Sequence, residues 1–77
     1  LHIYPNPTSN TLNIELPESL LGKYNYTLLT AEGKRVGQGI INSALSRIEA
    51  DRYSAGKYIL TLQNSERIIT GHFILKN

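Results

Sequence analysis

Two histidines and a single aspartate are the residues of this chain best suited to acid–base chemistry. His2 and His72 stand near the two ends of the sequence, and Asp51 stands between them. Nucleophilic catalysis needs a nucleophile, a base and a group that orients the base. The serines of the chain lie in no recognisable nucleophile motif. We therefore interpret both histidines as strand residues that face solvent, and we expect no enzyme.

A metal site would need three or four converging ligands, and two histidines with one aspartate show no ligand spacing. The chain has no cysteine, which excludes cysteine-based zinc sites and a disulfide framework. A calcium loop would need clustered carboxylates, and the acidic residues here are isolated along the sequence. We predict no metal and no cofactor.

Five tyrosines are a more informative feature of the composition. Tyr24 and Tyr26 fall on one face of an expected strand, in phase with Leu28. Either their rings line the edge of the core with the hydroxyls in water, or they form a platform that stacks on sugars. The shared phase with Leu28 favours the core. A carbohydrate-binding or adhesive module is the alternative function for the chain.

Length and charge set the broad class of the protein. With 77 residues we expect a single domain over 1–77. The eight basic residues are scattered, whereas nucleic-acid binders concentrate them in a patch, so we expect no nucleic-acid partner. No apolar run approaches the roughly 20 residues of a membrane-spanning helix. Because the first residue is Leu1, we expect a piece of a longer precursor with any targeting peptide upstream.

Apolar residues alternate with period two through most of the chain, which is typical of half-buried strands. The expected strands are residues 1–4, 11–16, 23–31, 34–41, 46–50, 57–63 and 66–76, with a connection over 18–22 that resembles a single helical turn. Glu32-Gly33 indicates a tight hairpin, and Gly37 and Gly39 indicate a bulge or a close backbone approach. About seven short strands predict an all-β, antiparallel sandwich.

Two short segments predict corners of this sandwich. In Tyr4-Pro5-Asn6-Pro7-Thr8 the prolines fix φ and remove backbone donors, so the first strand must end at Tyr4. Because this corner lies close to the start of the chain, we expect it to hold an upstream linker away from the sandwich. Tyr53-Ser54-Ala55-Gly56-Lys57-Tyr58 is similar to the tyrosine corner of immunoglobulin-like sandwiches, where the hydroxyl bonds back to nearby backbone.

Five segments, taken in order, carry a resemblance to a known family: "YPNP", "LNIEL", "YTLLTAEGKRV", "YSAGKYILTL" and "HFILKN". Together they resemble the type A C-terminal sorting domain of the type IX (Por) secretion system of Bacteroidetes, from about Ile3 to Asn77. The resemblance implies an immunoglobulin-like sandwich of seven strands. It also implies a signal that directs secreted proteins across the outer membrane.

The resemblance assigns sorting-motif positions residue by residue. These are Pro5, Asn6 and Pro7, then Gly33, Lys34 and Val36, then Gly56 and Tyr58, with Tyr53 in place of the usual leucine, and finally His72, Phe73, Ile74, Leu75 and Lys76. His72 stands where lysine is frequent in the family, so a charge-based contact at this position would depend on pH.

The resemblance also implies partners and a location. A family member is covalently linked to an upstream cargo domain, is recognised by outer-membrane components of the type IX machinery, and is commonly removed by a sortase-like peptidase. We therefore expect the protein in the periplasm during transit and then at the cell surface or outside the cell. We expect the last strand, as a sheet edge, to contribute to docking.

Overall fold

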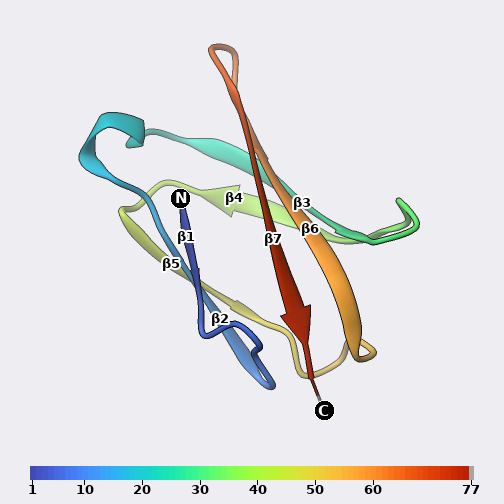
Figure 1. The fold of residues 1–77 in the computed structure, drawn as a ribbon. Helices are drawn as coiled ribbons and strands as arrows, with labels where there is room; N and C mark the ends of the chain where they lie inside the picture. Colours follow the sequence, from blue (N-terminus) through green and yellow to red (C-terminus); the bar gives the residue numbers. More distant parts are fainter. Residues whose placement is uncertain (77) are drawn as a thin grey trace.

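The computed structural model describes residues 1–76 as two antiparallel sheets packed face to face (Figure 1). The elements in chain order are β1 (His2–Tyr4), β2 (Thr11–Glu15), the 3-10 turn η1 (Glu18–Leu20), β3 (Tyr24–Thr30), β4 (Arg35–Ile41), β5 (Leu45–Glu49), β6 (Gly56–Gln63) and β7 (Ile68–Leu75). One sheet has the strand order β1-β2-β5 and the other has the order β4-β3-β6-β7. The predicted all-β sandwich is confirmed.

The core lies between the sheets and is built from alternating residues of both. Its buried side chains are Leu12, Ile14, Leu16, Tyr24, Leu28, Ile41, Ile48, Ala50, Tyr58, Leu60, Leu62, Phe73 and Leu75. Full burial of one large aliphatic side chain stabilises the fold by roughly 1.5–3 kcal/mol. The period-two pattern of the sequence therefore decides which face of each strand turns inward.

The hairpin between β3 and β4 is closed by a turn in which Gly33 has a φ of 92°, a conformation that favours glycine. Further along the hairpin, Leu28 lies opposite Gly37, whereas the next residue, Leu29, lies opposite Arg35. Val36 is therefore an extra residue on β4, which makes a β-bulge. Its half-buried side chain packs against the core.

The two glycines of β4 lie directly beneath aromatic rings. A Cβ on Gly37 would come within 2.7 Å of the Tyr53 hydroxyl oxygen, and one on Gly39 within 2.5 Å of Cε2 of Tyr26. No side chain fits at either position without a shift of the ring. The predicted bulge and the predicted close approach are both present on this strand.

The turn between β6 and β7 is longer than the sequence suggests, because β7 begins at Ile68 and not at Glu66. The side-chain oxygen of Asn64 accepts hydrogen bonds from the backbone N–H groups of Glu66 (2.9 Å) and Arg67 (3.0 Å). These two donors are therefore unavailable for pairing with β6. The turn extends through Arg67, whose carbonyl accepts from the Asn64 N–H at 3.1 Å.

The connection from β2 to β3 crosses between the sheets and contains η1. The hydroxyl of Tyr24 donates to the Leu20 carbonyl at 2.6 Å, which fixes this turn on the start of β3. The predicted single helical turn is confirmed. Within residues 1–76, no helix has the length and apolar character needed to span a membrane.

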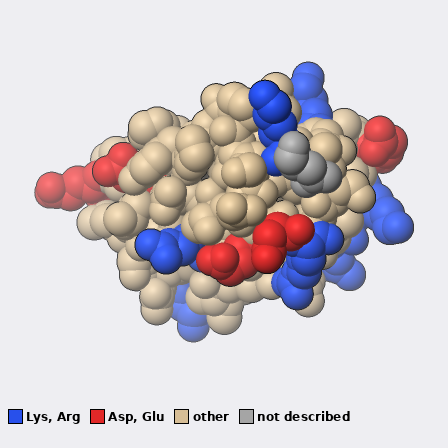
Figure 2. Space-filling view, turned by 90° about the horizontal axis from the view of Figure 1, so that it is seen from below, with Lys and Arg blue, Asp and Glu red and all other residues tan. Residues whose placement is uncertain are grey.

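On the face of the molecule seen from below, the charged side chains do not gather into one patch (Figure 2). Figure 2 shows Lys and Arg side chains spread around the periphery of the face seen from below, with Asp and Glu between them. The formal net charge of the chain is only +2. This face offers no continuous basic stripe of the kind that follows a nucleic-acid backbone.

Candidate functional site

The Pro-Asn-Pro corner is hydrogen-bonded directly to the last strand, β7. The Asn6 side-chain oxygen accepts a hydrogen bond from the Ile74 N–H at 2.9 Å. The peptide bonds before Pro5 and Pro7 are both cis. Asn6 and Ile74 are separated by 68 residues in sequence, so this bond joins the beginning of the chain to its end.

Thr8 extends this junction and was not singled out from the sequence. It pairs with Leu75 in an isolated parallel bridge, in which the Thr8 N–H donates to the Ile74 carbonyl at 2.9 Å and the Lys76 N–H donates to the Thr8 carbonyl at 2.7 Å. The Thr8 side chain is only 2% exposed, and its hydroxyl donates to the Thr11 carbonyl at 2.6 Å. The one feature of the sequence that could have indicated a role for Thr8 is a hydroxyl side chain directly after the proline corner.

The predicted terminal strand has the alternation that the sequence indicates. Phe73 and Leu75 are buried in the core at 1% and 2% exposure, whereas His72 and Ile74 face solvent. Lys76 follows the strand and is exposed. The motif positions on this strand therefore divide into core residues and surface residues, and only the surface residues are available to a partner.

The tyrosine corner is present as predicted. The hydroxyl of Tyr58 donates to the Ser54 carbonyl at 2.5 Å, and its ring stacks on Phe73 with the centroids 5.5 Å apart. Burial raises the pKa of the Tyr58 hydroxyl, and the neighbouring Tyr53 and Glu32 act in the same direction. The corner thus fixes the start of β6 against the end of β7.

The β3–β4 hairpin lies beside the tyrosine corner. A shallow hollow of about 210 Å³ separates them, lined by Thr30, Ala31, Glu32, Ser54, Ala55, Gly56, Lys57 and Tyr58. Gly33 and Lys34 form the exposed tip of the hairpin, next to this hollow in sequence. The motif positions Gly33 and Lys34 therefore lie at the same end of the four-stranded sheet as Gly56 and Tyr58, since Thr30 pairs with Tyr58.

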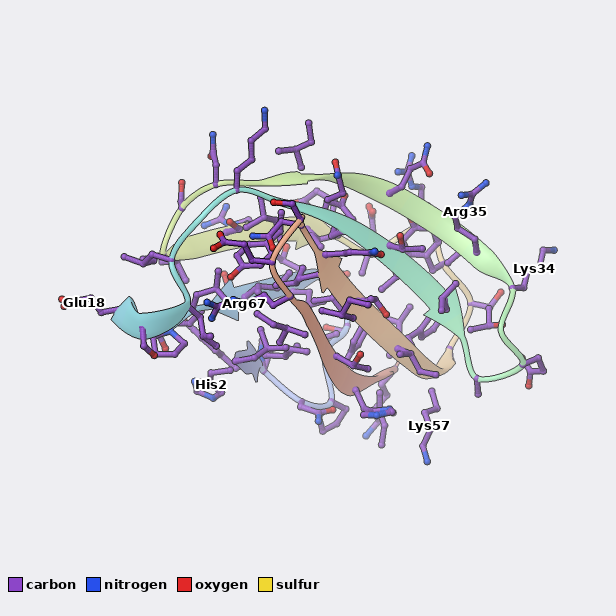
Figure 3. The ribbon with its side chains drawn as sticks, turned by 90° about the horizontal axis from the view of Figure 1, so that it is seen from above. His2, Glu18, Lys34, Arg35, Lys57 and Arg67 are labelled. Carbon is purple, nitrogen blue, oxygen red and sulfur yellow. The ribbon has the colours of Figure 1, made fainter. Side chains whose placement is uncertain are left out.

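These features all lie at one end of the sandwich, which we call the motif end. It comprises the Pro5–Thr8 corner, the β3–β4 hairpin, the Tyr53–Tyr58 segment and the end of β7. Figure 3 shows Lys34, Arg35 and Lys57 on this side of the molecule, and His2, Glu18 and Arg67 on the other. The structure thus brings together motif positions that are scattered along the sequence.

The expectation that the corner holds an upstream linker is wrong. His2 pairs with Glu15, the last residue of β2, whereas Tyr4 pairs with Asn13 and leads into the corner. Leu1 therefore lies at the end of β1 away from the corner, over Gly71 in the middle of β7 (Figure 1). The physical reason is the length of β1, which carries the chain away from its start before the prolines turn it.

The two tyrosines considered for sugar stacking are positioned differently from each other. Tyr24 is 1% exposed, so its ring is part of the core, as its phase with Leu28 predicts. Tyr26 is half-buried, and its ring lies over Gly39. Since the Tyr24 ring is enclosed, the pair does not form an exposed stacking platform.

The residues considered for catalysis lie on three different elements of the fold. His2 lies on β1 with its Nδ1 3.4 Å from Oε1 of Glu15, and His72 lies on the outer face of β7. Asp51 is in the turn after β5 and is exposed. Among residues 1–76, no group of three or more His, Cys, Asp or Glu side chains is arranged to hold a metal ion.

The fold and the motif end together define a small immunoglobulin-like β-sandwich module whose distinctive residues lie in its corners and its last strand. Comparison with protein families gives the particular family: the model of the secretion system C-terminal sorting domain matches residues 2–76, and the chain belongs to this family. The comparisons with curated proteins and with solved structures found no match. The chain is thus a type IX C-terminal sorting signal, of the kind found in Bacteroidetes, and such a signal implies export to the cell surface or beyond.

Proposed function

We propose that this domain acts as a folded export signal, recognised by outer-membrane components of the type IX machinery while it is attached to an upstream cargo. The observation that carries the proposal is the motif end, where Asn6 and Thr8 are bonded to the terminal strand. A signal shared by unrelated cargoes must present the same surface whatever precedes it. The motif end meets this requirement because it is built entirely from the domain's own residues.

The fate of the domain after recognition forms the second part of the proposal. The cargo and its signal pass through the periplasm, and a sortase-like peptidase then cuts the linker that precedes the domain. The position of Leu1 supports this order, since β1 separates it from the Pro5–Thr8 corner (Figure 1).

A reporter fusion tests both parts. Residues 1–77 are fused to the C-terminus of a periplasmic reporter in a Bacteroidetes host, and the same fusion is expressed in a strain without a working type IX system. We expect the reporter at the surface or in the medium, without the sorting domain, in the first strain only. A reporter retained in the periplasm of both strains would contradict the export signal. A reporter exported with the domain still attached would contradict the processing step alone.

A variant of the core tests whether the secretion machinery recognises the folded domain. Leu60 is 0% exposed, and Leu60→Asp places a charge in the core, which should unfold the domain. The matched control is Thr61→Asp, at a neighbouring position on the outer side of the same strand. We expect export of the control and retention of the Leu60 variant. Export of an unfolded Leu60 variant would show that a linear sequence is read.

A further inference from the structure

The last strand, β7, lies at the edge of the four-stranded sheet. In an antiparallel pair, alternate residues direct both backbone polar groups away from the partner strand. Both groups of Ile74 point away from β6, because its N–H donates to Asn6 and its carbonyl accepts from Thr8. The β6–β7 register is continuous from Gly56 and Leu75 through Gln63 and Ile68. Ile68, Thr70 and His72 therefore also direct their N–H and carbonyl groups outward.

The chain closes only one half of this edge. The corner covers it at Ile74 and Lys76. Within residues 1–76, no backbone or side-chain partner is present for the outward groups of Ile68, Thr70 and His72. We call this segment, Ile68–His72, the open edge. It is a row of alternating donors and acceptors that only another extended backbone can match.

The side chains of β7 lack the usual protection of an edge strand. Exposed edges are commonly guarded by charged side chains, by bulges or by being very short. The other edge strands follow this rule: β4 carries Arg35 and a bulge, β5 carries Arg47 and Glu49, and β1 has three residues. β7 has eight residues and contains no Lys, Arg, Asp or Glu.

Apolar groups flank the open edge on both sides. Ile68 is 63% exposed on the outer face of the sheet. On the inner side, Ile3 of β1 and the preceding Leu1 lie over Gly71, where a Cβ would come within 2.6 Å and 2.8 Å of their terminal carbons. Leu1 and Ile3 are only partly buried. An added strand with apolar side chains would cover both groups.

We propose that the open edge binds an extended, uncharged, β-branched or apolar segment of a type IX component by strand addition. This inference rests on the proposed function, which supplies the partner. An added strand can pair with β7 only as far as the corner, because the Ile74 N–H already donates to Asn6. The site therefore accepts about five residues, matching Ile68–His72. Recognition through backbone groups is independent of the cargo.

The test removes a single outward donor. Thr70→Pro deletes one N–H of the open edge without removing a hydrogen bond to β6, since proline is tolerated in an edge strand when its nitrogen faces outward. Thr70→Ala removes the side chain and keeps the donor, so it is the matched control. Both are made in the reporter fusion of residues 1–77, and the folding of each purified domain is checked by thermal unfolding and circular dichroism.

We expect the wild type and Thr70→Ala to be exported equally. For a folded Thr70→Pro variant we expect the exported fraction of the reporter to fall at least tenfold. Export of folded Thr70→Pro at the wild-type level would overturn the inference while leaving the proposed function intact. Failure of the wild type itself would instead contradict the proposed function. If Thr70→Pro does not fold, Thr70→Lys is used in its place, because it only adds a charge on the solvent side of the edge strand. Retention of the Thr70→Lys fusion supports strand addition, and its normal export refutes strand addition.

Discussion

The hydroxyl of Tyr58 offers the clearest test of what stabilises the motif end. Its only hydrogen-bond partner among residues 1–76 is the Ser54 carbonyl, at 2.5 Å. Its ring is 5% exposed and stacks on Phe73. Tyr58→Phe removes one oxygen and leaves the ring in place, so it creates almost no cavity and leaves the stacking intact.

The magnitude follows from the surroundings of the bond. A neutral hydrogen bond contributes a net ~0.5–1.5 kcal/mol to stability. Because Ser54 is exposed, water can bind its carbonyl once the hydroxyl is gone. We therefore expect a loss of about 1 kcal/mol in the free energy of unfolding. For a domain of this size such a loss lowers Tm by roughly 4–8 °C.

The assay is thermal and urea unfolding at neutral pH, with Tyr53→Phe as the control. Among residues 1–76 the Tyr53 hydroxyl has one hydrogen-bond partner, the exposed Arg52 guanidinium at 3.5 Å, so its removal should change stability by less than about 0.5 kcal/mol. Equal losses in the two variants would refute the reasoning, because they would show that the Tyr58–Ser54 bond contributes nothing specific.

Three further predictions concern the same end of the sandwich and its last strand. Because the pKa of Tyr58 is raised in the folded state, the stability that this hydroxyl contributes is complete below its ordinary pKa near 10 and is lost as pH rises through the folded-state pKa. Above about pH 10 the wild type should therefore lose free energy of unfolding more steeply than Tyr58→Phe. Parallel plots of stability against pH for the two proteins would contradict this. Asn6→Ala should speed amide exchange at Ile74 by roughly fivefold, the equivalent of ~1 kcal/mol, as measured by NMR, whereas an unchanged rate would disprove the bond. Gly71→Ala should cost about 1 kcal/mol through overpacking against Ile3, and adding Ile3→Ala should recover part of the loss in a double-mutant cycle; additive losses would exclude the contact.

The strands and the core could be predicted from the sequence because each rests on a local pattern. Leu12, Ile14 and Leu16 alternate within six residues, and all three are buried. The hairpin at Gly33 and the tyrosine corner are local in the same sense, since the residues that make each of them lie within a few positions. Such signals depend little on the rest of the fold.

The junction between the corner and the last strand could not be predicted in this way. The hydrogen bond between Asn6 and Ile74 joins residues 68 positions apart in sequence. Neither residue type, asparagine or isoleucine, indicates by itself that such a contact exists. The register at β7 depends on Asn64, whose side chain binds the next turn and delays the strand to Ile68. Contacts of this kind follow from the whole fold, and the sequence alone carries no pattern for them.

The parallel bridge between Thr8 and Leu75 also has a mechanical consequence. A force that pulls Leu1 and Lys76 apart would load both the segment that leads to Thr8 and the segment that follows Leu75. The two hydrogen bonds of the bridge, at 2.9 Å and 2.7 Å, join segments that run in the same direction and would be sheared together instead of opening one after the other. We expect the Thr8–Leu75 bridge to resist such a force more strongly than two hydrogen bonds that are loaded one at a time.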